Sequence, residues 1–283
     1  MSPGTAVALL RASGLDPLDA RVLLIHALGW RRTELITRGD EPLSDTQRAA
    51  FSALERRRLA GEPIAQITGR REFYGLDFEI TPDVLIPRPD TELLVETALS
   101  ELERRVRPHV ADLGTGSGAI AIAVACHRVD AEVTATDRSA AALTVARRNA
   151  TRLVDPARPG GEVRFEQGDW FDALGSRGAA RRFDLIVSNP PYIRAGDVHL
   201  SEGDLRFEPV DALTDHADGL SAIRIIAAGA RAWLVPGASL WMEHGYDQAA
   251  DVRALLDALG YTGVESRRDL AGIERITGAR TRL

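Results

Sequence analysis

Residues 110–122 read Val-Ala-Asp-Leu-Gly-Thr-Gly-Ser-Gly-Ala-Ile-Ala-Ile, a stretch that predicts a strand, a glycine-rich turn and the start of an apolar helix. Glycines let the backbone pass close to a ligand, and the N-terminus of the following helix presents free N–H groups. A glycine-rich turn alone is weak evidence, since many nucleotide-binding proteins have one. The order strand, turn, helix nevertheless favours an α/β fold with a ligand site at the turn. The residues expected there are Asp112, Gly114, Thr115, Gly116, Ser117 and Gly118.

The spacing of the turn narrows the class of ligand. Its glycines follow the pattern G-x-G-x-G, which differs from the G-x-G-x-x-G fingerprint of dinucleotide-binding proteins. Asp112 stands just before the turn, where its negative charge disfavours a pyrophosphate. The same charge suits a ligand that has a cationic amino-acid tail.

Polar residues also end the next two predicted strands. Asp137 follows residues 132–136 and lies 19 positions (137 − 118) beyond the last glycine of the turn, near the distance at which an acid binds ribose hydroxyls. Asp169 and Trp170 follow residues 163–167, where a carboxylate can accept from an adenine amine and an indole can cover the ring. Each of these acids, taken alone, could equally cap a helix. Only the acids taken together favour a ligand site.

A fourth predicted strand, the apolar run 183–187, is followed by Ser-Asn-Pro-Pro-Tyr. The Asn189 side chain offers an amide oxygen, and Pro190 has a carbonyl oxygen but no N–H. Tyr192 supplies a flat face for stacking. With Pro191, these residues predict a clamp for a planar group that bears an –NH2, either an amide or an exocyclic base amine. Taken alone, they also fit a tight Pro-Pro turn that closes a strand.

The ligand that fits all four strand ends is S-adenosylmethionine, which combines a sulfonium, an amino-acid tail, a ribose and an adenine. We expect the turn, Asp137, Asp169, Trp170 and Asn189 to bind this cofactor. The clamp then holds the nitrogen that receives the methyl group.

With these motifs in place, nearly the whole chain resembles the HemK/PrmC family, the protein-(glutamine-N5) methyltransferases that modify peptide chain release factors. The most specific stretches are residues 62–69, 72–76 and 85–92, and residues 268–272 add to them. One departure lies at residues 215–220, where the family usually has glycines ahead of Asp-Gly-Leu.

The resemblance implies an α/β fold, namely a Rossmann-like class I methyltransferase domain with a seven-stranded, mostly parallel sheet whose last strand is antiparallel. A small N-terminal helical domain is joined to it by a β-hairpin. We expect the helical domain over residues 1–71, the hairpin and linker over 72–90, and the methyltransferase domain over 91–283.

The implied reaction is methylation of the side-chain amide nitrogen (N5) of the glutamine in the Gly-Gly-Gln motif of release factors. S-adenosylhomocysteine is the by-product. Asn189, Pro190 and Tyr192 are the expected catalytic residues, and the N-terminal helices are expected to dock the release factor. Phe73, Arg88 and Pro89 are expected to shape the mouth of the pocket, although a packing aromatic and a stiff loop explain them equally well.

Two other classes of protein fit the same motifs. An N6-adenine or N4-cytosine methyltransferase would present an exocyclic amine to the same clamp, but it must also extract the base from its stack. The net charge of −6 argues against tight non-specific binding of nucleic acid. A non-catalytic module that has kept a nucleotide pocket is the other class, and the intact clamp argues against it.

Composition gives the remaining expectations. The single cysteine, Cys126, cannot form an intramolecular disulfide, which suits a reducing cytosol. No apolar run is long enough to span a membrane, and no Cys/His cluster has metal-ligand spacing. We therefore expect a cytoplasmic monomer without a metal, a membrane anchor or a direct nucleic-acid partner.

Several elements can be predicted individually. Apolar spacing predicts a helix over residues 16–30 and another that begins at Ser44 or Asp45. Residues 72–81 alternate as in a hairpin, and Asp90 is expected to cap a helix over 91–106. A core strand is expected over 239–243, with an antiparallel edge from 264–267 and 275–277.

Overall fold

The computed structural model describes residues 4–175 and 182–283. The chain forms two compact units. The first is the chain up to Arg70 together with Glu202–Phe207, and the second is Arg71–Ser201 together with Glu208–Leu283.

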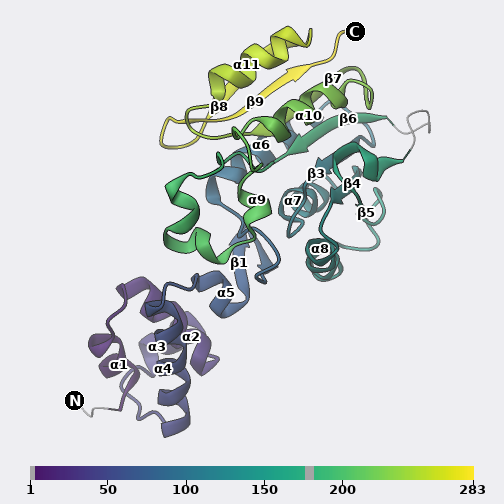
Figure 1. The fold of residues 1–283 in the computed structure, drawn as a ribbon. Helices are drawn as coiled ribbons and strands as arrows, with labels where there is room; N and C mark the ends of the chain where they lie inside the picture. Colours follow the sequence, from purple (N-terminus) through teal and green to yellow (C-terminus); the bar gives the residue numbers. More distant parts are fainter. Residues whose placement is uncertain (1–3, 176–181) are drawn as a thin grey trace. The chain divides into compact units, whose positions relative to one another are not determined.

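The first unit is helical. Its helices are α1 (Ala6–Ala12), α2 (Pro17–Leu28), α3 (Arg32–Thr37), α4 (Asp45–Leu59) and α5 (Ile64–Thr68) (Figure 1). Leu23, Leu24 and Phe51 are buried in its core. The side chains of Asp16 and Ser44 cap α2 and α4, so of the two predicted caps for α4 the structure selects Ser44.

The segment Glu202–Phe207 belongs to this helical unit although it is distant in sequence. Arg58 Nη1 donates to Asp204 Oδ1 at 3.0 Å, and Gln66 Nε2 donates to the Phe207 carbonyl at 2.9 Å. Arg206 Nη2 donates to the Ala60 carbonyl at 2.8 Å. No sequence pattern indicated this return of the chain.

The second unit begins with the predicted hairpin, formed by β1 (Arg70–Phe73) and β2 (Leu76–Glu79). Phe73 and Phe78 are buried and lie edge to face, with ring centroids 6.1 Å apart. The buried Asn149 accepts from Glu79 N and donates to the carbonyls of Glu79 and Ser117. The hairpin is therefore hydrogen-bonded, through one side chain, to the glycine-rich turn.

The main sheet has seven strands in the order β5-β4-β3-β6-β7-β9-β8 (Figure 1). They are β3 (His109–Leu113), β4 (Glu132–Asp137), β5 (Arg164–Gln167), β6 (Phe183–Ser188), β7 (Leu234–Glu243), β8 (Thr262–Arg268) and β9 (Glu274–Arg280). β9 is antiparallel to both of its neighbours, whereas β3 to β7 pair in parallel. This confirms the predicted sheet with an antiparallel last strand.

β7 starts earlier than the predicted residues 239–243 and runs through Pro236 and Gly237. A shift in its register with β6, between Phe183 and Leu185, accommodates these two residues. A proline is tolerated there because a bulge removes the need for its N–H.

Helices cover both faces of the sheet. α6 (Glu92–Leu102), α7 (Ala119–His127) and α8 (Ala140–Leu153) form one layer, and α10 (Ser221–Ala230) and α11 (Ala249–Ala258) form the other. Short elements include η1 (Pro89–Thr91), η2 (Trp170–Leu174), η3 (Val198–Ser201), η4 (Gly203–Phe207) and α9 (Val210–Leu213). The predicted cap of α6 is wrong, because η1 precedes the helix and Asp90 instead pairs with Arg275 at 3.2 Å.

Among the helices of the two described ranges, none combines the length and apolar character that crossing a bilayer requires.

Candidate active site

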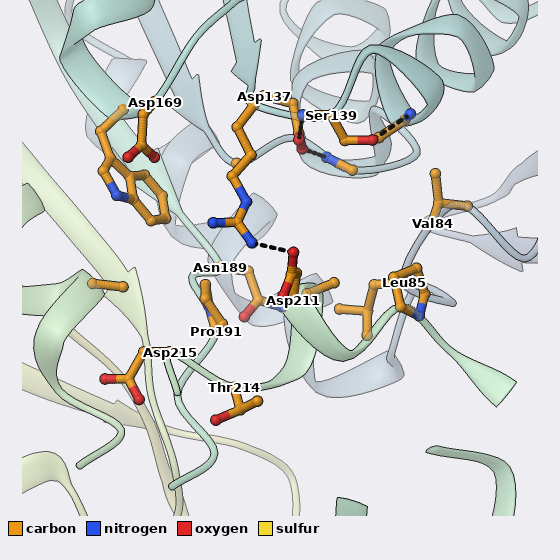
Figure 2. A pocket seen from close by; sticks show the side chains of 18 of the residues that line it. Val84, Leu85, Asp137, Ser139, Asp169, Asn189, Pro191, Asp211, Thr214 and Asp215 are labelled. Carbon is orange, nitrogen blue, oxygen red and sulfur yellow. Dashed lines mark hydrogen bonds and ion pairs between the residues drawn. The ribbon is translucent and has the colours of Figure 1, made fainter. Parts of the chain in front are cut away.

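The carboxyl ends of β3, β4, β5 and β6 meet at one edge of the sheet, where open α/β sheets bind their ligands. A cavity of about 360 Å³ lies there. In Figure 2, Asp137 and Asp169 lie on one side of it and Thr214 and Asp215 on the other, with Asn189 and Pro191 between them. Of the predicted site residues, those that line the cavity are Gly114, Gly116, Asp137, Asp169, Trp170, Asn189 and Pro191.

Asp137 holds the glycine-rich turn in place. Its two carboxylate oxygens accept from the N–H groups of Gly116, at 2.9 Å, and Ser139, at 2.8 Å. Burial raises the pKa of Asp137, although these two hydrogen bonds oppose the shift. Asp137 thus fixes the turn and also faces the cavity.

Gly114 and Trp170 lie in close contact across the turn. Gly114 has φ +75°, and a Cβ atom at this position would lie 3.3 Å from the indole of Trp170. Trp170 itself has φ +44°, a left-handed conformation that costs free energy in a residue other than glycine. The backbone is therefore strained where it directs the indole along the cavity wall.

Asp112 lies behind the turn and does not line the cavity. It is 0 % exposed, and its Oδ2 accepts from the Thr115 hydroxyl at 2.6 Å and from Ala121 N at 3.2 Å. Its Oδ1 has no hydrogen-bond partner within the described ranges. Burial raises the pKa of this carboxyl to about 7.

Thr115, Ser117 and Gly118 also lie outside the cavity lining. Thr115 and Ser117 are buried, and a Cβ on Gly118 would lie 2.7 Å from the Ile122 side chain. Together with Asp112, these residues shape the turn and its junction with α7. They do not line the cavity, and their predicted role in cofactor binding stays a prediction.

Asn189 reaches the cavity with a defined orientation. Its Nδ2 donates to Thr91 Oγ1 at 3.2 Å, and its Oδ1 accepts no hydrogen bond from the described residues. Pro191 lines the cavity next to it, whereas Pro190 is buried. The carbonyl of Pro190 likewise has no partner in the described part of the chain. Two acceptor oxygens from adjacent residues thus receive no hydrogen bond from the part of the chain that the structure describes.

Tyr192 was predicted to stack on the substrate amide, and this stays a prediction. Its ring packs against the core and does not line the cavity. Its hydroxyl donates to Glu243 Oε1 at 3.2 Å, and its carbonyl accepts from Gln248 Nε2 at 3.0 Å. Burial raises the pKa of Tyr192, and the nearby Glu243 carboxylate adds to the shift.

Glu243, the last residue of β7, is a buried acid that sequence reasoning missed. It is 2 % exposed, and its Oε2 has no hydrogen-bond partner within the ranges described. Burial raises its pKa to about 7, while the hydroxyls of Thr91 and Tyr192 act in the opposite direction. Its position at the end of an apolar strand was the only feature of the sequence that could have indicated a site residue here.

The three residues expected at the pocket mouth do not line the cavity. Phe73 is 1 % exposed and belongs to the core of the hairpin. Arg88 pairs with the buried Glu208, which also accepts from Ile86 N at 2.8 Å. Pro89 is exposed in η1, and substrate contacts for this set stay a prediction.

The rim of the cavity includes charged residues that were not predicted. Arg138 pairs with Asp211 at 2.6 Å, and His216 Nε2 lies 2.6 Å from the other oxygen of Asp211. His216 has φ +58°. Glycine adopts this left-handed backbone more readily than histidine does, and Asp215 supports the loop by accepting from three backbone N–H groups.

Over the two ranges that the structure describes, no group of three or more His, Cys, Asp or Glu side chains could hold a metal ion.

Solved structures of methyltransferases share this fold. One from Pyrococcus furiosus has a TM-score of 0.53 and 21% identity, and the match covers 82% of this chain and 100% of that one. The 16S rRNA N2 G1207 methyltransferase of T. thermophilus has a TM-score of 0.53 and 22% identity, covering 75% of this chain and 50% of that one. At these identities the likeness shows the fold alone.

Two family models match the chain. The PrmC N-terminal domain matches residues 5–69, and the methyltransferase small domain matches residues 89–204.

Curated relatives match over almost the whole length. A release factor glutamine methyltransferase of Burkholderia pseudomallei is 64% identical, covering 99% of this chain and 97% of its own. One of Bordetella pertussis is 57% identical, covering 95% of this chain and 97% of its own, and one of Neisseria gonorrhoeae is 51% identical, covering 95% and 94%. The chain therefore belongs to the release factor glutamine methyltransferase family.

Proposed function

We propose that this protein transfers a methyl group from S-adenosylmethionine to the N5 amide nitrogen of the Gly-Gly-Gln glutamine in a peptide chain release factor. The observation that supports this most is the orientation of Asn189. Its Oδ1 accepts no hydrogen bond from residues 4–175 or 182–283, and the residue lines the same cavity as the glycine-rich turn. Membership in the family supplies the class of acceptor.

The cavity fits the cofactor. Its volume of about 360 Å³ lies within the range of small-molecule sites. Asp137 suits the ribose hydroxyls, and Asp169 and the Trp170 indole suit the adenine amine and ring. The absence of a side chain at Gly114 leaves the wall open beside the indole. When bound, S-adenosylmethionine supplies a methyl group that is made electrophilic by its sulfonium.

The chain's own groups must activate a poor nucleophile, because an amide nitrogen shares its lone pair with the carbonyl. Asn189 Oδ1 and the Pro190 carbonyl would each accept one amide hydrogen, which orients the nitrogen and stabilises the positive charge that develops on it. With S-adenosylmethionine bound, this nitrogen would form a bond to the methyl carbon while the carbon–sulfur bond broke with its electron pair left on sulfur. The amide proton would then leave to water. Orientation alone lowers barriers by roughly 7–11 kcal/mol in favourable cases.

We further infer that the helices over residues 4–70 dock the body of the release factor while the cavity receives its glutamine loop. These helices have their own buried core and match the PrmC N-terminal domain. The domain limits 1–71, 72–90 and 91–283, the cytoplasmic location and the monomeric state stay predictions. Hydrogen exchange on the full chain, with and without release factor, tests the docking, and unchanged exchange in α1–α5 would contradict it.

The test of the function is methyl transfer from labelled cofactor to purified release factor. We expect Asn189→Ala to lower turnover by about 10²-fold or more, as loss of a preorganised polar partner does. The matched control is Val198→Ala, because Val198 is exposed and does not line the cavity. The acceptor control is a release factor whose Gly-Gly-Gln glutamine is replaced by alanine.

Label should appear in the wild-type release factor and be absent from the Gln→Ala acceptor. Equal labelling of both acceptors would refute the proposed substrate. Transfer to DNA or RNA instead would favour the alternative of an adenine or cytosine methyltransferase.

A further inference from the structure

Asn189 and Glu243 are neighbours at the edge of the sheet. β6 and β7 run parallel, with Ser188 opposite Met242, so the next residues along each strand lie side by side. Thr91, the last residue of η1, joins them from a distant part of the sequence. Its buried hydroxyl accepts from Asn189 Nδ2 at 3.2 Å and lies close enough to Glu243 to lower the pKa of that carboxyl.

These contacts decide which way the Asn189 amide faces. A carboxamide has a donor end and an acceptor end of nearly the same shape, so sterics alone do not distinguish its two orientations. A threonine hydroxyl can both donate and accept, and by itself it would tolerate either orientation. An ionised carboxylate only accepts. Glu243 Oε2 is buried and has no hydrogen-bond partner within the described ranges, so it is free to take the single hydrogen of the Thr91 hydroxyl. Once it does, the oxygen of that hydroxyl can only accept from Asn189.

We propose that Thr91 and Glu243 are positioning residues that fix the Asn189 carboxamide with its oxygen toward the substrate amide. This rests on the proposed function, in which Asn189 Oδ1 accepts a hydrogen of the glutamine amide. The reverse orientation would point –NH2 at –NH2, where no hydrogen bond forms. Tyr192 strengthens the arrangement because its hydroxyl also donates to Glu243.

The proposed orientation of the Asn189 carboxamide depends on the ionisation of Glu243. Asp90 raises the pKa of Glu243, whereas Arg275, Thr91 and Tyr192 lower it, and burial is the largest effect. A protonated Glu243 can donate to Thr91, which frees the threonine hydrogen to point at Asn189 and removes the preference for one orientation. Turnover at saturating substrate should therefore fall as the pH drops through about 7, where this carboxyl protonates.

The experiment uses the full-length enzyme with release factor and compares Thr91→Val, Thr91→Ser and Glu243→Gln. Thr91→Val keeps the shape but removes the hydroxyl, and we expect kcat to fall about 10-fold or more while the Kd for S-adenosylhomocysteine stays unchanged. Thr91→Ser keeps the hydroxyl and should restore kcat. Glu243→Gln should lower kcat and abolish its decline below pH 7, because the side chain no longer ionises.

A purely structural role gives a different pattern, in which thermal stability, cofactor affinity and kcat fall together and the pH profile keeps its shape. That pattern would overturn the inference, as would wild-type kcat in Thr91→Val. If Thr91→Val does not fold, the pH profile of Glu243→Gln decides, and a persistent decline below pH 7 overturns the proposal. An active Asn189→Ala enzyme would refute the proposed function itself, whereas an inactive one with unaffected Thr91 and Glu243 variants would refute only this inference.

Discussion

Asp112→Asn should change how the stability of the protein depends on pH. The wild-type carboxyl is 0 % exposed, and burial raises its pKa from 3.8 to about 7. Between these two values the folded state binds a proton that the unfolded state has released. The contribution of Asp112 to the free energy of unfolding therefore falls as pH rises from about 4 to about 7. The difference between the two pKa values corresponds to about 4 kcal/mol.

The amide of Asp112→Asn does not titrate over this range. The variant therefore lacks the decrease in the free energy of unfolding that accompanies deprotonation of Asp112 in wild type. Its oxygen can still accept from Thr115 and from Ala121 N, the two partners of the wild-type carboxyl. Any fixed cost of the new –NH2 group appears equally at every pH. We expect the free energy of unfolding of the variant, relative to wild type, to improve by up to about 4 kcal/mol between pH 4 and pH 8.

Urea unfolding followed by tryptophan fluorescence and circular dichroism, at pH 4, 5, 6, 7 and 8, measures this difference. Asp45→Asn is the matched control, because the Asp45 side chain is 94% exposed, and it should run parallel to wild type. A constant offset between Asp112→Asn and wild type at all five pH values would refute the view that Asp112 is a buried, desolvated acid. Improvement toward low pH would refute it as well.

Three further substitutions, one of them with a matched glycine control, test the residue assignments. Gly118→Ala should lower the free energy of unfolding by about 2–4 kcal/mol, from left-handed strain plus overpacking against Ile122. Gly196→Ala, at φ +77° in open space, should cost only the strain, and equal losses in the two variants would contradict this. Trp170→Ala should weaken cofactor binding by about 1–3 kcal/mol, since the indole is proposed to stack on adenine, and calorimetry measures it. Phe73→Ala should lower the free energy of unfolding by about 3–5 kcal/mol without raising KM for release factor. A raised KM would indicate that Phe73 contacts the substrate.

Features that depend on neighbours in sequence could be predicted from the chain alone. The glycine-rich turn, Asp137 and the Asn189 loop each follow an apolar strand directly, and parallel strands bring such ends to one edge. The antiparallel end of the sheet followed from two short strands near the C-terminus. Local pattern and chain direction were enough for a parallel sheet with an antiparallel edge and for the cavity's main residues, whereas the number of strands was implied by the family resemblance.

Features that depend on long-range packing could not be predicted. Glu243 lies next to Asn189 only through the register of β6 with β7, and Thr91 hydrogen-bonds to Asn189 from a separate segment. The direction in which a side chain points cannot be predicted from the sequence either. Asp112 turns into the core, whereas Asp137, on the next strand, lines the cavity. Phe73 was expected at the pocket mouth for the same reason, because an aromatic residue in a short hairpin fits either a surface or a core.

The most direct measurement is a crystal structure of this protein with S-adenosylhomocysteine and a release-factor peptide that contains the Gly-Gly-Gln sequence. We predict that the glutamine amide nitrogen lies at hydrogen-bond distance, about 3 Å, from both Asn189 Oδ1 and the Pro190 carbonyl oxygen. We also predict that Asn189 Nδ2 stays on Thr91. An Asn189 side chain turned away from the amide, or a glutamine bound elsewhere on the enzyme, would contradict the mechanism.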